Sequence, residues 1–271
     1  MPDRPTLPTP PEHLPLTRGG RPRKAWSYAG VFTDELLLCA AVARIGPLPV
    51  AWWAVWDREQ RTLAEHTLRG RSANVVVVEG GRVRVADGPV SIELDLESDP
   101  GAGVETISPH GEQYIWTRKQ GGVPVRGRVT LLDRTREIEG FGVLDESAGY
   151  HARHTSWCWS AGVGVAESGA AVAWNLVDGI HDAAGASERT VWVDAVAHEA
   201  GATRFAGDLS WLESDGVRLD FHAEATRERE ERLLAFASRY EQPFGSFSGS
   251  LPVAGALRSG LGVMERHDVS W

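Results

Sequence analysis

The stretch "NVVVVEGGRVRVADG", residues 74–88, decides the fold class. It consists of two short valine-rich runs separated by Gly80 and Gly81. Adjacent glycines supply the left-handed backbone that a tight hairpin turn requires, and valine favours extended structure. The stretch therefore predicts two antiparallel β-strands joined around the glycines.

The alternation of apolar and polar side chains continues on both sides of this hairpin. In "SIELDLE", 91–97, and "VRLDFHAE", 217–224, every second residue is apolar, as in a half-buried strand. Similar runs lie at 126–132, 162–165, 171–177 and 190–193. Many short strands with Gly, Asp and Ser between them predict an antiparallel all-β protein with few helices.

Two segments fit either a helix or a strand. The segment "ATREREERLLAFASRY", 225–240, is rich in helix formers, and a helix would place Leu233, Phe236 and Ala237 on one side. The segment "TDELLLCAAVARI", 33–45, is equally ambiguous. The sequence leaves both open.

Two pairs of similar sequence segments suggest that the chain is built from two related halves. "AWSYAGV" (25–31) followed by "PVAWWAVWD" (49–57) is similar to "SWCWSAGVG" (156–164) followed by "AVAWNLVDG" (171–179). Coincidence among Trp-rich strands is the alternative explanation. A genuine repeat predicts a first β half at 25–149 and a second at 150–271. Residues 1–24 are expected to form an extended arm, because seven of the first 22 residues are proline.

Composition limits the class of partner. The 37 acidic and 28 basic residues give a net charge of -9, which repels nucleic acid and anionic membrane surfaces. Two cysteines are too few for a disulfide framework, and the start lacks the apolar segment of a signal peptide, so we expect a cytoplasmic location. The most apolar run, 36–56, contains Arg44 and two prolines and is not expected to be an integral membrane segment.

Metal, nucleophile and nucleotide sites are not predicted. His151, His154 and Cys158 have donor atoms suited to zinc, but alternation along a strand directs the two histidines to opposite faces. No Gly-x-Ser-x-Gly motif supports a nucleophilic serine, and the glycine pairs at 140–142 and 162–164 lack the continuation of a nucleotide-binding loop. We therefore expect no metal and no cofactor.

The tryptophans suggest a pocket for a small hydrophobic molecule. Trp157 and Trp159 share one face of a predicted strand, and Trp174 lies on another strand. Packing in a solid core is the alternative for each ring. Polar groups at strand ends would orient the ligand, and the predicted ligand-binding residues are His154, Trp157, Trp159, Trp174, Asn175, Asp178 and Glu241. Further polar candidates at strand ends are Glu188, Arg189, Gln242, Glu265 and His267.

The blocks "KQGGVPVRG", "GFGVLDESAGYHARHTSWCWSAGVG", "VAWNLVDGIHD", "SERTVWVD", "YEQPFGSFSG" and "GLGVMERHDVSW" occur in this order. From about Trp26 to Trp271 the chain resembles an uncharacterised bacterial domain-of-unknown-function family. That family is remotely similar to lipocalin-like (calycin) two-barrel proteins such as carotenoid hydratases. The resemblance implies a lipocalin-like barrel or two related β-barrel or sandwich halves, and it transfers no catalytic residue.

Three functions follow as hypotheses. The first is binding or carriage of a lipid or isoprenoid-like molecule in a Trp-lined β-barrel pocket. The second is a cofactor-free hydratase, cyclase or isomerase in which a buried carboxylate acts as general acid. The third is a protein-interaction module with a filled core. The oligomeric state stays undetermined by the sequence.

Overall fold

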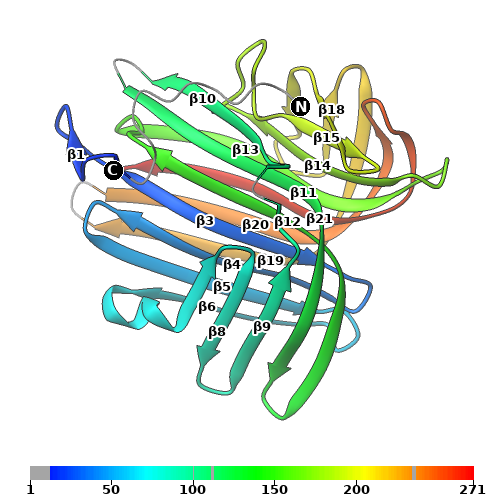
Figure 1. Cartoon of the computed structure of the whole chain (residues 1–271), viewed down its shortest axis with the longest axis horizontal. Coiled ribbons are helices and arrows are strands. Elements are labelled where there is room, and N and C mark those ends of the chain that lie inside the picture. Colours follow the sequence, from blue (N-terminus) through cyan, green and yellow to red (C-terminus); the bar gives the residue numbers. More distant parts are fainter. Residues whose placement is uncertain (1–12, 100, 111–112, 234–235) are drawn as a thin grey trace.

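The computed structural model describes residues 13–99, 101–110, 113–233 and 236–271, and these residues form an antiparallel all-β protein (Figure 1). Five of the seven N-terminal prolines lie outside the described residues. The described part of the arm contains a two-stranded hairpin of β1 (Thr17–Arg18) and β2 (Arg21–Pro22). Leu14 packs near Tyr150, whose hydroxyl donates to the Pro15 carbonyl at 2.7 Å, so this part of the arm lies against the body.

The first sheet is built from residues 24–149. Its strands are β3 (Lys24–Phe32), β4 (Leu36–Ile45), β5 (Leu48–Asp57), β6 (Thr62–Arg69), β7 (Val76–Glu79), β8 (Arg82–Asp87), β9 (Val90–Leu96), β10 (Val104–His110), β11 (Gln113–Leu131) and β12 (Arg134–Gly149). A short 3-10 helix, η2 (Gly70–Val75), precedes β7. The hairpin predicted at 74–88 is confirmed, because β7 pairs with β8 and both Gly80 and Gly81 have positive φ.

The second sheet is built from residues 154–270. Its strands are β13 (His154–Ala166), β14 (Ala171–Asp178), β15 (Thr190–Val193), β16 (Val196–Glu199), β17 (Thr203–Phe205), β18 (Trp211–Ser214), β19 (Val217–Leu233), β20 (Phe236–Leu251) and β21 (Gly255–Ser270). Both segments that the sequence left open are strands: 33–45 contains β4, and 225–240 contains the end of β19 and the start of β20, with 234–235 outside the described residues.

The two sheets have the same topology. In each, the first strand pairs with the last: β3 with β12, and β13 with β21. The next three strands extend from the first strand to one edge, ending at β6 or β16, and the chain then crosses to the far edge and returns strand by strand. The additional strand β10 pairs with β11 only. The chain is thus a lipocalin-like fold of two related halves.

The similar sequence segments correspond to only part of this structural repeat. Residues 25–31 lie in β3 and 156–164 lie in β13, which are the first strands of the two halves. Residues 49–57 lie in β5, the third strand of its half, whereas 171–179 begins in β14, the second strand of the other. The repeat is therefore clear in the order of the strands, and the second pair of Trp-containing segments is displaced by one strand.

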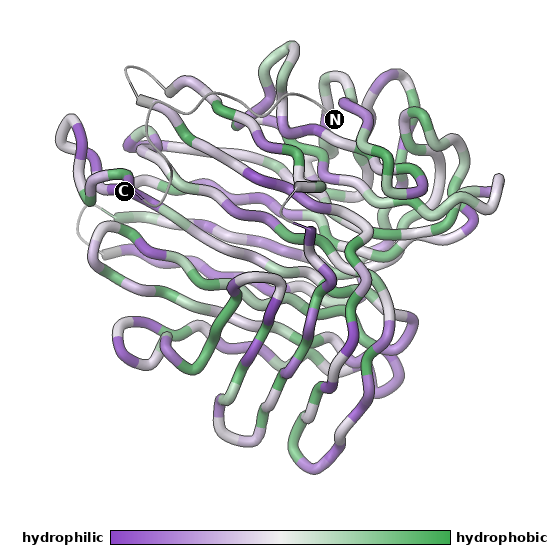
Figure 2. The backbone as a smooth tube through the Cα atoms, in the orientation of Figure 1, coloured by the Kyte–Doolittle hydropathy of each residue, from purple (hydrophilic) through white to green (hydrophobic). Residues whose placement is uncertain are grey.

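Alternating faces of the central strands belong to different hydrophobic cores. Along β3, Ala29 and Val31 face the core of the first half, whereas Tyr28 and Phe32 face a core shared by both sheets. In the second half, Trp174 belongs to that half's own core. The shared core joins the strands that run side by side in the middle of Figure 1, and Figure 2 shows hydrophobic and hydrophilic residues alternating along them.

Gly121 on β11 lies close to side chains of the second half. A Cβ placed there would lie 2.5 Å from Cε3 of Trp192 and 2.9 Å from Cβ of Ala173, both in the second half. Close backbone approach of this kind requires glycine. Gly121 therefore fixes how tightly the two halves pack.

We predict that Gly121→Ala lowers the free energy of unfolding by about 1–3 kcal/mol, because overpacking forces the sheets apart. Denaturant unfolding measures the change. Gly185→Ala is the control, since a Cβ there meets no atom within 4 Å. Equal stability of the two variants would contradict the tight contact.

Candidate functional site

A cavity of about 820 Å³ lies between the two sheets, and strands of both halves line it. It continues the shared core toward the end where β3 begins and β21 ends, so it is outside the interior of either half. Its walls are mainly apolar and aromatic. The aromatic lining residues are Trp26, Tyr28, Trp52, Trp157, Trp159, Phe236, Tyr240 and Trp271.

The alternation of side chains along a strand explains why the lining residues of β3 and β13 occur at every second position. Lys24, Trp26 and Tyr28 follow one another at every second position of β3, and Trp157 and Trp159 do the same on β13. The rings of Tyr28 and Trp159 meet edge to face with centroids 5.4 Å apart, which closes the cavity where the two first strands approach.

Glu265 is the principal acidic group of the cavity and is 8% exposed. Its Oε1 accepts a hydrogen bond from Nε1 of Trp157 at 2.8 Å. Its Oε2 accepts from the Tyr240 hydroxyl at 2.9 Å and from Nε2 of Gln242 at 3.1 Å. Burial raises the pKa of Glu265 to about 7, while the hydrogen bonds from Trp157 and Tyr240 oppose the rise. Near neutral pH this carboxyl can therefore hold or release a proton.

A buried ion cluster lies in the same cavity. Nζ of Lys119 is 2.6 Å from Asp145 and 3.3 Å from Glu188, and all three side chains line the cavity. Burial disfavours the charged amine, but the two carboxylates outweigh it and raise the pKa of Lys119. Burial and the neighbouring Glu188 raise the pKa of Asp145, against the effect of Lys119. The cluster stays charged only because its members pair.

The two halves place their carboxylates at equivalent positions. Asp145 on β12 pairs in register with Tyr28 on β3, and Glu265 on β21 pairs with Trp159 on β13. Each last strand thus presents one acid beside an aromatic residue of the first strand. Their surroundings differ, because Asp145 has an amine partner and Glu265 accepts hydrogen bonds from neutral groups.

His267 completes the wall beside Glu265. Its ring packs against Trp157, with centroids 4.5 Å apart, and its Nε2 lies 2.8 Å from the Ser238 hydroxyl. Burial and the nearby Arg227 guanidinium lower the pKa of His267 to about 3. The imidazole is therefore neutral near pH 7 and contributes shape and hydrogen bonding without charge.

The structure brings some of the predicted ligand-binding residues to the cavity. Trp157 and Trp159 line it. Asn175 lies directly behind this wall, where Oδ1 accepts a hydrogen bond from Nε1 of Trp159 at 2.8 Å and Nδ2 donates to the Glu188 carbonyl at 2.9 Å. Trp174 faces the core of the second half and donates to the Ser160 hydroxyl at 3.0 Å.

The other three predicted residues lie away from the lining. His154 is exposed and lies 3.6 Å from Asp268. Asp178 is exposed at the end of β14, and Glu241 is half-buried on β20, next to the lining residue Tyr240. Of the further polar candidates, Glu188, Glu265 and His267 line the cavity. The cavity residues Lys24, Lys119 and Asp145 are absent from both predicted sets.

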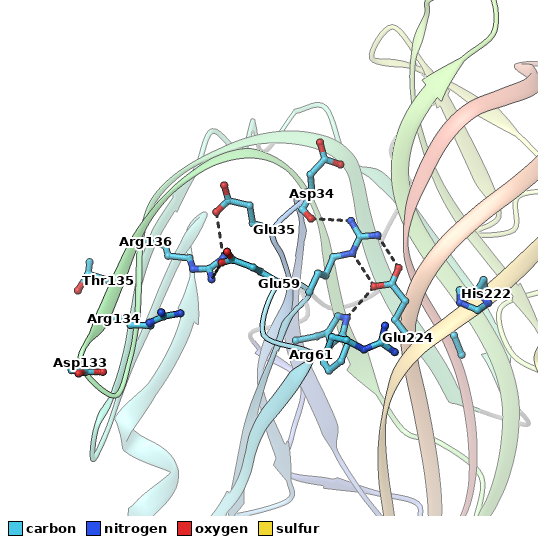
Figure 3. Close-up of a pocket in the computed structure, with 13 residues that line it drawn as sticks. Asp34, Glu35, Glu59, Arg61, Asp133, Arg134, Thr135, Arg136, His222 and Glu224 are labelled. Carbon is cyan, nitrogen blue, oxygen red and sulfur yellow. Dashed lines mark hydrogen bonds and ion pairs between the residues drawn. The ribbon is translucent and has the colours of Figure 1, made fainter.

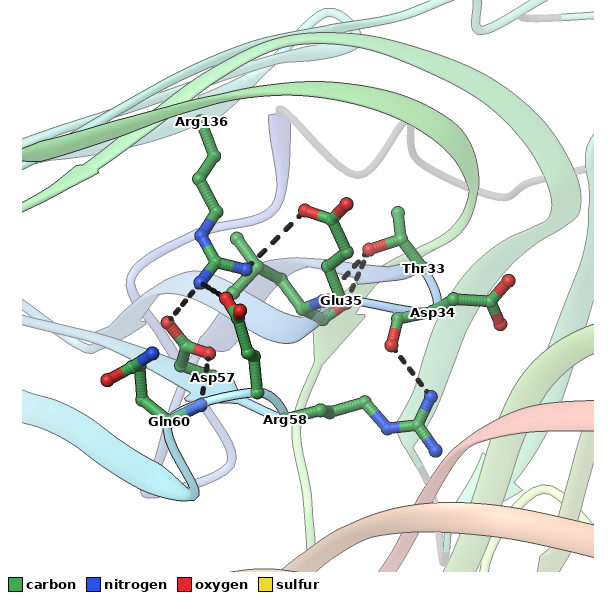
Figure 4. A network of polar contacts seen from close by, with 9 residues as sticks. Thr33, Asp34, Glu35, Asp57, Arg58, Gln60 and Arg136 are labelled. Atoms are coloured by element: carbon green, nitrogen blue, oxygen red, sulfur yellow. Dashed lines mark hydrogen bonds and ion pairs between the residues drawn. The ribbon is translucent and has the colours of Figure 1, made fainter.

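A second, open pocket lies at the other end of the junction between the halves (Figure 3). There Arg58 binds Glu224 of β19 through two hydrogen bonds of 2.8 Å, and Nε1 of Trp56 donates to the same carboxylate. Figure 4 shows Arg136 between Glu35 and Asp57. The contacts of Arg58 and Trp56 with Glu224 link the two halves, whereas Arg136, Glu35 and Asp57 pair within the first half, so both sets have a structural role.

Among the described residues, no group of three or more His, Cys, Asp and Glu side chains is arranged to hold a metal ion. Within the same ranges, no helix has the length and apolar character needed to cross a membrane. Among these described residues, the lining of the cavity contains no candidate metal centre; it includes aromatic rings, the four carboxyl groups of Asp145, Glu188, Glu231 and Glu265, and several lysine and arginine side chains.

The chain belongs to the family described as a domain of unknown function, DUF2804, whose profile matches residues 71–271. No protein with a curated description matches it. Two of the solved structures that share the fold illustrate the likeness. One is a Nitrosomonas europaea protein described as a candidate AttH, with 14% identity, a TM-score of 0.59 and coverage of 97% of this chain and 98% of that one. The other is kievitone hydratase from Nectria haematococca, with 12% identity, a TM-score of 0.56 and coverage of 90% and 88%. The resemblance to the domain-of-unknown-function family and to lipocalin-like proteins is confirmed.

We predict that Glu265→Gln gains stability relative to the natural chain as the pH rises from about 5 to about 8. The raised pKa makes the protonated carboxyl the favoured form in the folded state, so its contribution is full below the unfolded pKa and is lost as the pH passes the folded pKa. A shift from 4.5 to about 7 corresponds to on the order of 3 kcal/mol at most.

Denaturant unfolding of both proteins across this pH range gives the difference directly, and contributions from His267 and Lys24 cancel in it. Glu93→Gln, at an exposed position of β9, is the control and should show no such trend. A difference that does not vary with pH would contradict the raised pKa of Glu265.

Proposed function

We propose that this DUF2804 protein binds a small hydrophobic molecule in the cavity between its sheets and that Glu265 acts on it as a general acid. A cavity of about 820 Å³ is within the usual range for ligand sites, and apolar walls with a few convergent polar groups are typical of them. The observation that supports catalysis is the protonatable Glu265 beside the Trp157 ring in this apolar space.

The proposed reaction class is addition of water to an alkene, or its reverse. Protonated Glu265 transfers its proton to one alkene carbon, and the π electrons form the new C–H bond. Indole faces of Trp157 and Trp159 stabilise the carbocation that develops on the other carbon. A water molecule forms the C–O bond there and loses a proton, which restores the carboxylic acid. That a structure of the same fold is a hydratase agrees with this class.

Carriage without turnover is the second candidate. The extent of the aromatic wall supports it, because rings such as Trp52 and Trp271 offer contact area for an apolar molecule. Binding is common to both candidates, and proton transfer distinguishes them. The size of the cavity argues against the hypothesis of a filled core.

We predict that N-phenyl-1-naphthylamine, a neutral apolar probe, quenches tryptophan fluorescence of the protein in a saturable manner. Trp157→Ala should weaken this binding about tenfold or more, because it removes one wall of the cavity. Fluorescence titration measures it, with Trp211→Ala as control, since Trp211 on β18 is not among the lining residues. Absence of saturable binding to the natural protein would overturn the proposed function.

Turnover is tested with isoprenoid alkenes, farnesol and lycopene, incubated in ¹⁸O-labelled water and analysed by mass spectrometry. We expect one labelled oxygen in the product and a loss of about a hundredfold or more in rate for Glu265→Gln. Glu93→Gln should retain the rate. Saturable probe binding together with unlabelled alkenes would favour the carrier.

A further inference from the structure

The chain contains two lysines, Lys24 and Lys119, and arginine supplies all its other basic residues. Both lysines line the cavity between the sheets, and their exposed fractions are 2% and 3%. Lysine is normally among the most exposed residue types. Lys24 on β3 and Lys119 on β11 thus bring both lysine amines into one apolar cavity. The cavity therefore differs chemically from the surface, where the basic residues are arginines.

The two amines have different surroundings. Lys119 is held between Asp145 and Glu188 and remains an ammonium group. Lys24 makes no ion pair with any carboxylate of the described residues, and its Nζ lies 3.7 Å from the centroid of the Trp271 ring. A structural cation would be expected to have a counter-ion at this depth.

Lys24 has the properties of a buried nucleophilic amine. Burial, together with the positive charge of the nearby Arg21, lowers the pKa of Lys24 to about 7. The face of the Trp271 ring favours the ammonium form and limits the fall. Near neutral pH a large fraction of the side chain is therefore the neutral amine, which is the form that attacks carbonyl groups.

We propose that Lys24 is a covalent binding site for the carbonyl group of an apolar aldehyde held in the cavity between the sheets. The proposal rests on the cavity taking hydrophobic molecules, as argued above, and it is independent of the acid role of Glu265.

The bond changes are those of imine formation. The lone pair of Nζ forms a bond to the carbonyl carbon, and the π electrons of the carbonyl move to its oxygen, which takes a proton from the nitrogen. The resulting carbinolamine loses water, with the hydroxyl group leaving from carbon and the second proton leaving from nitrogen. A carbon–nitrogen double bond remains, and no oxidant or reductant is consumed.

The test uses farnesal, an apolar aldehyde, with the purified full chain and sodium cyanoborohydride, which reduces an imine to a stable amine. Peptide mass spectrometry then locates the modified nitrogen. We expect Lys24 to be labelled about tenfold or more faster than Nα-acetyllysine, added to the same solution as the reference for an accessible amine, and than the paired Lys119. Farnesol, which has the same skeleton without the carbonyl, should compete and reduce the labelling.

Lys24→Arg keeps the positive charge and removes the nucleophile, so it should abolish labelling at position 24. The natural chain itself gives the decisive result, so the proposal does not depend on folding of this variant. If farnesal quenches tryptophan fluorescence but labels Lys24 no faster than Nα-acetyllysine, the covalent site is refuted and the proposed function stands. If neither farnesal nor farnesol binds, both the covalent site and the proposed function are refuted.

Discussion

The central constraint of this structure is that the middle strands of both halves are buried on both faces. One face of β3, β4 and β5 packs in the first half's own core, and the other packs against β13, β14 and β21. The same is true in reverse for the second half. Side chains at every second position must therefore serve an interface between two sheets. Where these side chains are alanine, valine and phenylalanine, the interface is solid. Toward the start of β3 they are larger, polar or aromatic, the sheets are held apart, and the cavity forms.

This location determines the electrostatics of the site. The cavity lies between two layers of protein, so ionisable groups that face it lose water from both sides. Burial raises the pKa of Glu265 and lowers those of His267 and Lys24. The charged cluster around Lys119 is retained because the ammonium group has two acidic partners, Asp145 and Glu188, at contact distance. The low dielectric of the cavity thus favours the neutral forms of isolated groups such as Glu265, His267 and Lys24, and it leaves Lys119 charged within a compact ion cluster. A site with both kinds of group is suited to moving a proton within an apolar volume.

Alternation in the sequence predicts the strands well wherever one face is exposed, as at 74–88 and 217–224. It fails to decide 33–45, because β4 is buried on both faces and its continuous apolar run has no two-residue period. Alternation also places Trp157 and Trp159 on one face, which the structure shows to be the cavity wall. The opposite orientation of Trp174 and the inward position of Glu265 depend on the registers of β14 and β21 with β13, which no local pattern specifies. Lys119 and Asp145 come from the other half of the chain, so only the packing of the halves brings them to the site.

Duplication of topology explains how such a site can exist without either half containing it. Each half closes its sheet by pairing its last strand with its first, and each thereby presents an acid beside an aromatic ring: Asp145 with Tyr28, and Glu265 with Trp159. Face-to-face packing of the two sheets brings these two acid–aromatic pairs together, as the contact between the rings of Tyr28 and Trp159 shows. The strands that flank these pairs differ, since β11 supplies an amine to Asp145 whereas β20 supplies the neutral donors Tyr240 and Gln242 to Glu265. The carboxyl groups of Asp145 and Glu265 therefore occupy equivalent positions in the two sheets but have different partners. Asp145 stays paired with Lys119, whereas Glu265 is free to exchange its proton.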